Sequence, residues 1–210
     1  MPGAIDNVYI DETRADSERI AYDVIGGEEP VSLCGSGLIS LMSVLLEENI
    51  IDRSGHFIIR DDFNIRGEGN VSRENDENFF SLTGSVYITE DDILNLIRSK
   101  AAIYAGIKVL NNFMGLEADD IGHIYISGGF GRNLNTLHAT SIGMFPQKAD
   151  ESFSFVGNSS LAGALKVLCD RTINPEEVAT SIMNIELSAN NAFMDEFIKA
   201  CFLPHTDLTF

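Results

Sequence analysis

The apolar periodicity in the middle of the chain constrains its fold more than any other feature. Between Leu94 and Met114, apolar residues recur every three or four positions, which predicts one long helix. Thr89 is expected to cap the start of this helix, and Gly115 is expected to end it. Residues 123–127, His-Ile-Tyr-Ile-Ser, then read as a β-strand. A helix of this length that leads into a strand is typical of α/β proteins.

Shorter strands and helices alternate along the rest of the chain. Strands are expected at 8–10, 20–25, 86–88 and 153–156, and helices at 38–48, 159–170, 191–201 and after Asn174-Pro175. No repeat or clear linker interrupts this order, so the sequence predicts a single α/β domain over residues 1–210. Residues 61–80 are polar, and we expect a variable loop there that is exposed from Arg66 to Asn78.

The charge balance excludes some classes of partner. The chain carries 32 acidic and 14 basic residues, a net charge of −18. Such a chain repels phosphate backbones and anionic lipid surfaces, so we expect no nucleic-acid partner and no membrane partner. No apolar run approaches the roughly 20 residues that span a bilayer, and the N-terminus lacks the basic and apolar regions of an export signal. These features favour a cytoplasmic protein.

The cysteines and histidines do not form a recognisable site. Cys34, Cys169 and Cys201 are far apart, and their spacing matches neither a zinc site nor an iron–sulfur cluster. We expect reduced, buried thiols. The four histidines are equally scattered, and no Ser-His-Asp set or pair of carboxylates stands out by spacing. The sequence therefore assigns no catalytic residue and no metal ligand.

A glycine-rich segment stands where the strand at 123–127 ends. It reads Gly128-Gly129-Phe130-Gly131. Glycines lack a Cβ atom and accept positive φ, so the backbone here can approach a flat or charged ligand. A helix that begins near Asn133 would add free N–H groups at the same place. The segment matches neither a Walker A loop nor a G-x-G-x-x-G fingerprint. A nucleotide-binding turn and a plain strand-to-helix turn both remain open.

Three further features are weaker candidates. The turn Gly35-Ser36-Gly37 precedes an apolar helix and could hold an anion, although a packing turn is the simpler alternative. Lys100 lies on the long helix, where it could reach a ribose or a phosphate; a lysine whose aliphatic stem follows the surface is the commoner case. Small residues at 162–164 predict a helix that packs closely against a sheet or another helix.

Taken in order, these segments resemble the C-terminal domain of the reductive activators of corrinoid proteins. The resemblance rests on Pro2–Asp6, Ile25-Gly26, Cys34–Ile39, Ile88–Asp92, Lys100–Ile103, Ser127–Gly131, Ile142–Pro146 and Val156–Asn158. It covers the whole chain except the loop near 61–80. Each motif is short, but their common order is specific.

The resemblance implies a fold and a site. The family belongs to the superfamily of acetate and sugar kinases, heat-shock chaperones and actin, whose members have two ribonuclease H-like lobes with ATP between them. It implies that this chain is a ribonuclease H-like, actin-like ATPase lobe with a mixed sheet flanked by helices. Gly128, Gly129, Phe130 and Gly131 would form its adenosine motif. Lys100 would face the cleft from the neighbouring helix, and Gly35-Ser36-Gly37 would line it.

The resemblance also implies an activity for the whole protein. Members couple ATP hydrolysis, with Mg²⁺, to reduction of cob(II)alamin to cob(I)alamin in the corrinoid protein of a methyltransferase system. The electron comes from an iron–sulfur cluster in another domain. The lobe that holds the phosphate- and metal-binding acids would precede Met1, and Ser40 stands where many relatives have an acid. We therefore expect this chain to be inactive alone.

Two other functions remain open at this stage. A small-molecule kinase of the same superfamily would phosphorylate an acid or a sugar. A non-catalytic interaction or dimerisation module would use its glycine turns only for structure. The sequence also leaves open whether the chain forms a homodimer, and it does not identify the particular corrinoid partner.

Overall fold

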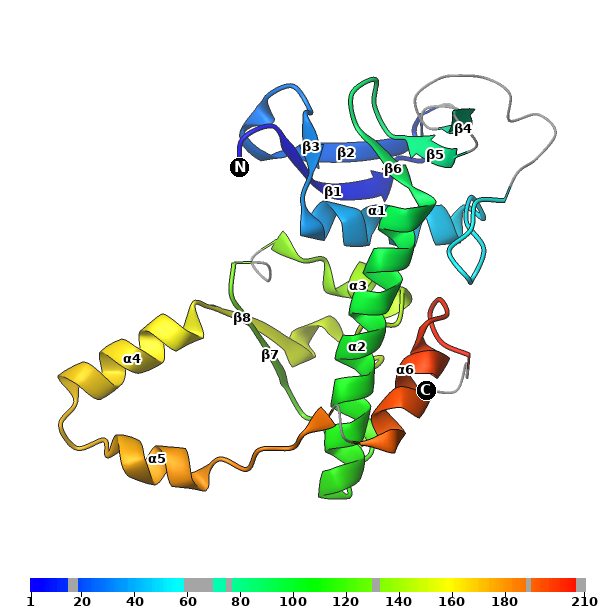
Figure 1. Cartoon of the computed structure of the whole chain (residues 1–210). Coiled ribbons are helices and arrows are strands. Elements are labelled where there is room, and N and C mark those ends of the chain that lie inside the picture. Colours follow the sequence, from blue (N-terminus) through cyan, green and yellow to red (C-terminus); the bar gives the residue numbers. More distant parts are fainter. Residues whose placement is uncertain (15–18, 59–69, 75–76, 130–132, 188–189, 207–210) are drawn as a thin grey trace.

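The computed structural model describes residues 1–14, 19–58, 70–74, 77–129, 133–187 and 190–206 (Figure 1). The strands are β1 (Ala4–Ile10), β2 (Ile20–Val24), β3 (Ser32–Leu33), β4 (Asn70–Glu74), β5 (Glu77–Ser81), β6 (Tyr87–Thr89), β7 (Ile124–Ser127) and β8 (Phe153–Gly157). The helices are α1 (Gly35–Glu47), α2 (Glu90–Met114), α3 (Thr136–Ser141), α4 (Ser159–Cys169), α5 (Pro175–Ser181) and α6 (Asn191–Ala200). The alternation confirms the predicted α/β class.

The described strands form three small sheets. In the first, β1 lies between β2, which is antiparallel to it, and β3, which is parallel, so this sheet is mixed. The second is the antiparallel sheet β4-β5-β6. The third pairs β7 and β8 in parallel, with Ile124 opposite Phe153. Because parallel strands point the same way, the segments that leave β7 and β8 emerge at one edge.

Helix α2 runs along most of the molecule and connects its two ends (Figure 1). Its start follows the sequence prediction: Thr89 and Asp92 form a capping box, with the Asp92 N–H 3.3 Å from Thr89 Oγ1. It ends at Gly115, whose φ of 68° is left-handed. One face buries Ile93 and Ile97 in the main core. The helix therefore packs against β5 and β6 of the second sheet and against α6.

Helix α1 packs on β1 and forms the centre of the core. Ile39 and Leu45 of α1 are buried with Ile5 and Val8 of β1. The helix begins three residues earlier than the predicted 38–48 and ends at Glu47. Its apolar composition nearly all round fits this buried position.

Residues 66–78 are not the continuous exposed loop that we expected. Strand β4 begins at Asn70 and pairs with β5 from Glu77 onward. Val71 and Phe80 face each other across this pair, and both are buried in the core. Burial of these two apolar side chains favours the strand pair, although the residues around them are polar. Residues 61–69 and 75–76 of the same predicted loop lie outside the described part of the chain.

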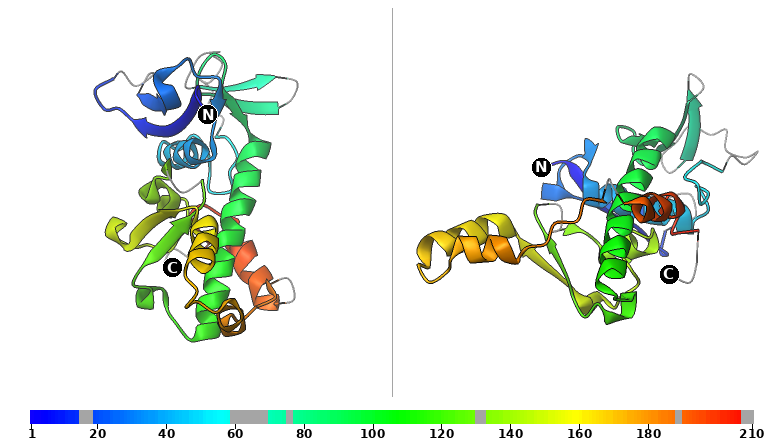
Figure 2. Two further views of the ribbon diagram at one scale, coloured as in Figure 1. Left: turned by 90° about the vertical axis from the view of Figure 1, so that its left-hand side faces the viewer. Right: turned by 60° about the horizontal axis from the view of Figure 1, so that its bottom comes forward.

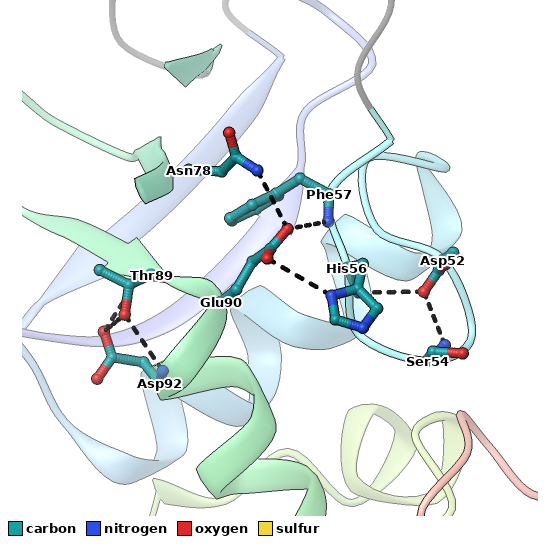
Figure 3. A network of polar contacts seen from close by, with 8 residues as sticks. All are labelled: Asp52, Ser54, His56, Phe57, Asn78, Thr89, Glu90 and Asp92. Carbon is teal, nitrogen blue, oxygen red and sulfur yellow. Dashed lines mark hydrogen bonds and ion pairs between the residues drawn. The ribbon is translucent and has the colours of Figure 1, made fainter. Parts of the chain in front are cut away.

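Glu90 connects the start of α2 to two neighbouring segments (Figure 3). Its Oε1 accepts a hydrogen bond from the Phe57 N–H at 3.0 Å and lies 3.5 Å from Asn78 Nδ2 of β5. Its Oε2 lies 3.5 Å from His56 Nδ1. Asp52 orders the same turn by accepting the His56 N–H at 3.0 Å. The carboxylate of Glu90 therefore connects the start of α2 to the turn at His56–Phe57 and to β5.

Helices α4 and α5 project away from the rest of the molecule (Figures 1 and 2). Both are well capped, by Asn158 and by Asn174 with Pro175, as the sequence predicts. Neither has a buried residue. The close packing expected of residues 162–164 is absent, because a Cβ atom on Gly163 would meet no atom of the described chain within 4 Å.

Candidate functional site

The glycine turn after β7 lies beside the end of β8. The Gly128 N–H donates a hydrogen bond to the carbonyl oxygen of Gly157 at 2.7 Å. Gly128 has φ of 94° and Gly157 has φ of 64°, and both values favour glycine over residues with a Cβ atom. The two strand exits therefore form one turn region built on left-handed glycines.

Gly129 differs from Gly128, because neither its conformation nor its packing requires glycine. Its φ lies outside the left-handed range, and an added Cβ atom would meet no described atom within 4 Å. Within the described part of the chain, the space around the Cβ position of Gly129 is therefore open. Phe130 and Gly131, the other two residues of the predicted adenosine motif, lie outside the described residues.

The helix expected near Asn133 begins later and is short. It is α3, which starts at Thr136 and has six residues. Asn135 caps it by accepting hydrogen bonds from the Leu137 and His138 N–H groups. The free N–H groups at this helix start are therefore partly occupied by a side chain, contrary to the sequence expectation.

The second candidate turn is held against β1. The Cys34 N–H donates a hydrogen bond to the Ile5 carbonyl at 3.0 Å. A Cβ atom on Gly37 would lie 2.3 Å from that same carbonyl oxygen, so only glycine fits there. Ser36 is buried, and its hydroxyl lies 3.1 Å from Cys34 Sγ. Packing thus accounts for Gly37, the simpler of the two alternatives for this turn.

Strand β1 contacts both the turn at 34–37 and Asn133, which follows the glycine-rich segment. Ile5 contacts the turn at 34–37, as described above. The next residue, Asp6, accepts a hydrogen bond from Asn133 Nδ2 at 2.8 Å, directly after the glycine turn of β7. The turn at 34–37 and Asn133 therefore contact consecutive residues of one strand, although they are distant in the sequence.

A pocket of about 630 Å³ opens between β3, α1, β6 and α2. This volume is within the range of small-molecule sites. Gly35 is the residue of the predicted site that lines it in the described chain. Its polar lining comes from Ser32, Ser85, Asp92, Asn95 and Ser99, and its apolar lining includes Leu38, Tyr87 and Met144. The pocket therefore lies at the start of α1.

Lys100 does not have the position in the cleft that we expected. Its side chain is 0% exposed. Its Nζ donates hydrogen bonds to the carbonyl oxygens of Phe202 and Pro204, each at 2.6 Å. Burial lowers the pKa of Lys100 from 10.5 to about 7, and the neighbouring Cys201 thiol opposes this shift. The amine therefore binds the segment after α6 and does not line the pocket.

The other ionisable groups do not add a reactive centre in the described chain. Within it, no group of three or more His, Cys, Asp and Glu residues is placed to hold a metal ion. Cys34, Cys169 and Cys201 are free thiols, and Cys169 is exposed although we expected it to be buried. None of the described helices is long and apolar enough to cross a membrane.

Comparison with known proteins agrees with this architecture. Residues 1–210 match the family described as the C-terminal domain of RACo, the ASKHA domain. The chain belongs to this family. It therefore has the ASKHA, or actin-like, fold, with its mixed sheet and flanking helices.

Two matched proteins have names that state an activity. The corrinoid activation enzyme RamQ of Eubacterium limosum is 26% identical over 205 residues, which cover 90% of this chain and 34% of that protein. A solved structure, a reductive activator for corrinoid,iron-sulfur protein, is 40% identical, with a TM-score of 0.84 over 100% of this chain and 34% of its own. This chain thus spans about a third of the length of both relatives.

Sequence reasoning missed the part that β8 and β1 play at the site. Gly157 was recognised as the end of a strand, but its hydrogen bond to Gly128 depends on the parallel pairing of β7 and β8. The strand–helix–strand order around 123–157 was the signal that could have predicted this pairing. Asp6 carried no comparable signal, because its contact with Asn133 depends on the tertiary fold.

Proposed function

We propose that this chain is the ATP-binding lobe of a reductive activator of corrinoid proteins. Gly128, Gly129, Phe130 and Gly131 would form its adenosine motif. Of the turn Gly35-Ser36-Gly37, Gly35 would line the cleft, whereas the buried Ser36 and Gly37 would only shape the turn. The observation that carries this assignment is the hydrogen bond from the Gly128 N–H to the Gly157 carbonyl, which brings two left-handed glycines together at one edge of the β7–β8 sheet. The names of both relatives support the class of partner.

The site fits a nucleotide better than it fits a bare anion. Left-handed glycines at the ends of β7 and β8 keep side chains away from a flat base or ribose. The chain has a net charge of −18, so ATP phosphates need local N–H groups and a cation. Mg²⁺ would be held by the phosphates and by acids of the preceding lobe. It would neutralise charge on the phosphates, while this chain orients the adenosine.

In the whole activator, ATP hydrolysis would drive the reduction of cob(II)alamin to cob(I)alamin in the corrinoid protein of a methyltransferase system. The electron would come from an iron–sulfur cluster in another domain, since such clusters need about four ligands and this chain has three scattered cysteines. The two nucleotide states would differ in lobe angle and in affinity for the corrinoid protein. We place this system in the cytoplasm.

Calorimetric titration with Mg²⁺–ATP tests the site assignment. The samples are this chain and its fusion to the part of the 40% identical activator that this chain does not cover. In the fusion, Gly129→Val is expected to weaken ATP binding by at least about tenfold, or 1.4 kcal/mol, because the new side chain fills the open space. The fold should survive, since the Cβ atom meets nothing within 4 Å.

Gly122→Val is the matched control. Gly122 also lies next to β7, has no left-handed φ and has open space around its Cβ position. It should leave ATP binding unchanged. Equal ATP affinity of the Gly129→Val fusion and the wild-type fusion would make the turn structural and contradict the assignment. ATP turnover that responds to a corrinoid protein tests the activity itself, and a phosphorylated acid or sugar would indicate a kinase instead.

A further inference from the structure

The pocket of about 630 Å³ has one polar wall, which α2 provides. Asp92, Asn95 and Ser99 line it at intervals of three and four residues, so they share one face of the helix. The opposing walls are mainly apolar, and their residues include Val31, Leu33, Leu38, Tyr87 and Met144. Small-molecule sites commonly combine an apolar lining with a few placed polar groups. This pocket therefore fits a flat ring that carries hydrogen-bonding groups along one edge.

The carboxylate of Asp92 is held in one direction by the capping box of α2. Its Oδ2 accepts a hydrogen bond from the Thr89 N–H at 3.0 Å and another from Thr89 Oγ1 at 2.9 Å. The second carboxylate oxygen points away from Thr89 (Figure 3). Within the described part of the chain, the capping box thus uses one oxygen of Asp92 and leaves Oδ1 to accept a hydrogen bond from a ligand.

Asn95 adds a donor one turn further along the same wall. Its Oδ1 accepts a hydrogen bond from Arg98 Nη1 at 3.0 Å, so the other end of the amide, Nδ2, is available to donate. The Ser99 hydroxyl donates to the Asn95 carbonyl oxygen at 2.9 Å, within the helix. The wall of α2 therefore presents an acceptor at Asp92 and, beside it, a donor at Asn95.

We propose that the base of ATP occupies this pocket and that Asp92 and Asn95 select adenine. The inference rests on the nucleotide site of the proposed function. Adenine carries a donor, its N6 amine, next to an acceptor, N1, and this order matches Asp92 Oδ1 and Asn95 Nδ2. Hypoxanthine, the base of ITP, carries the opposite order, with the acceptor O6 next to the donor N1–H. ITP would place acceptor against acceptor and donor against donor, which costs binding energy.

Charge sets the direction in which the nucleotide lies. The carboxylate of Asp92 repels phosphates, so the triphosphate lies away from the first turn of α2. On the α1 side of the pocket, Gly35 follows the N-cap Cys34, which makes no side-chain cap bond, so backbone N–H groups and the helix dipole favour an anion there. The base therefore lies against α2, and the ribose and phosphates extend toward Gly35.

Exchange of the two residues tests the selection. Asp92→Asn combined with Asn95→Asp keeps the charge of α2, and the amide oxygen at position 92 can still accept from Thr89. The exchange reverses the order of acceptor and donor. Calorimetric titration of the fusion with Mg²⁺–ATP and Mg²⁺–ITP measures both dissociation constants. We expect the wild type to prefer ATP by at least about tenfold, and the exchange to lower this preference at least about tenfold.

Asp91→Asn is the matched control. Asp91 is an exposed acid in the same first turn of α2, and it is not among the described residues that line the pocket. Asp91→Asn should retain the preference of the wild type for ATP. The single variant Asp92→Asn should lower the preference as well, because its amide nitrogen then meets O6 of ITP. It carries the test if circular dichroism shows that the exchanged protein does not fold.

The outcomes separate this inference from the nucleotide site itself. A wild type that binds ITP as tightly as ATP, or variants at Asp92 that keep the wild-type preference, overturn the selection. A change in the preference for ATP over 2′-deoxy-ATP alone would place Asp92 on the ribose, which also overturns it. If Gly129→Val still weakens ATP binding in these cases, the proposed function stands. A wild-type fusion that binds neither nucleotide overturns both.

Discussion

At the residue scale, the glycines of the candidate site have different physical reasons to be glycine. Gly37 is required by contact, because α1 presses against the Ile5 carbonyl. Gly128 is required by its left-handed φ. Gly129 has neither reason within the described chain. A valine at Gly129 therefore tests ligand binding, whereas substitutions at Gly37 or Gly128 would mix binding with stability.

Lys100 is the residue whose ionisation is most tightly coupled to folding. Burial lowers its pKa to about 7 in the folded chain, against 10.5 for a free lysine. Between these values the unfolded chain binds a proton that the folded chain lacks, so the free energy of unfolding rises with pH. Burial also raises the pKa of the Cys201 thiol above 9.0, which weakens folding at higher pH. The effect of Lys100 is therefore clearest between pH 7 and 8.5.

We expect the free energy of unfolding to rise by up to about 1.4 kcal/mol per pH unit in this window. Lys100→Met removes the titrating amine and should remove most of the rise. Urea unfolding at pH 7.0, 7.5, 8.0 and 8.5 measures it. Lys108→Met, two turns further along α2 and half-buried, is the control that should retain the rise. Equal slopes in the wild type and in Lys100→Met would contradict a neutral Lys100 in the folded chain.

The sequence could predict where Gly128 and Gly129 lie, directly after β7, and their part in ligand binding stays a prediction. It failed at Lys100, whose position depends on tertiary contacts. Glycines after a strand indicate close backbone approach, and Gly128 and Gly129 lie where that reasoning puts them. Lys100 was expected in the cleft because the family resemblance places it on the helix next to the adenosine motif. Its direction toward Phe202 and Pro204 depends on how α6 packs, which no local pattern encodes.

At the element scale, the boundaries of the capped helices α2, α4 and α5 were predictable because capping is a local interaction, whereas α1 and α3 begin away from their predicted starts. Thr89, Gly115, Asn158 and Asn174 all occupy the predicted terminal positions. The β4–β5 hairpin was missed because its burial depends on core contacts, for which Val71 and Phe80 are the main residues. Polar composition describes the outer face of such a hairpin, and it says little about the inner face.

The cap of α2 should be measurable. Thr89→Ala removes the acceptor for the Asp92 N–H and the donor to the Asp92 carboxylate. We expect a loss of about 1 kcal/mol in the free energy of unfolding, measured by urea titration followed by circular dichroism. Ser99→Ala is the matched control, since Ser99 is an exposed hydroxyl residue inside the same helix. If Thr89→Ala lowers the free energy of unfolding no more than Ser99→Ala does, the cap does not stabilise α2.

At the scale of the whole molecule, the short segment after α6 connects elements that are distant in sequence. Leu203 and Arg53 form two hydrogen bonds with each other. The Leu203 N–H donates to the Arg53 carbonyl at 2.8 Å, and Arg53 Nε donates to the Leu203 carbonyl at 2.9 Å. Lys100 of α2 bonds the carbonyls on either side of Leu203. Pro204 lies so close to Gly143 that a Cβ atom there would fall 2.0 Å from its carbonyl oxygen. The segment therefore joins α2, the turn after α1 and the turn after α3.

Because this segment joins three parts of the core, its loss should destabilise the whole molecule. The Leu203 side chain is 0% exposed and belongs to the main core. Leu203→Ala is expected to lower the free energy of unfolding by about 2–5 kcal/mol, through lost burial and the cavity left behind. Urea unfolding followed by circular dichroism and by tyrosine fluorescence measures this, and the two signals should still change together.

Leu137→Ala provides the comparison, because the exposed Leu137 should cost less than about 0.5 kcal/mol. Two results would contradict a connecting role for the segment. One is a cost for Leu203→Ala close to that of Leu137→Ala. The other is a separate, earlier transition in tyrosine fluorescence alone, since the Tyr104 ring contacts the tilted ring of His205 in this segment and would report its local release. A single transition at lower urea would instead indicate that the C-terminal segment, α1 and α2 unfold as one cooperative unit.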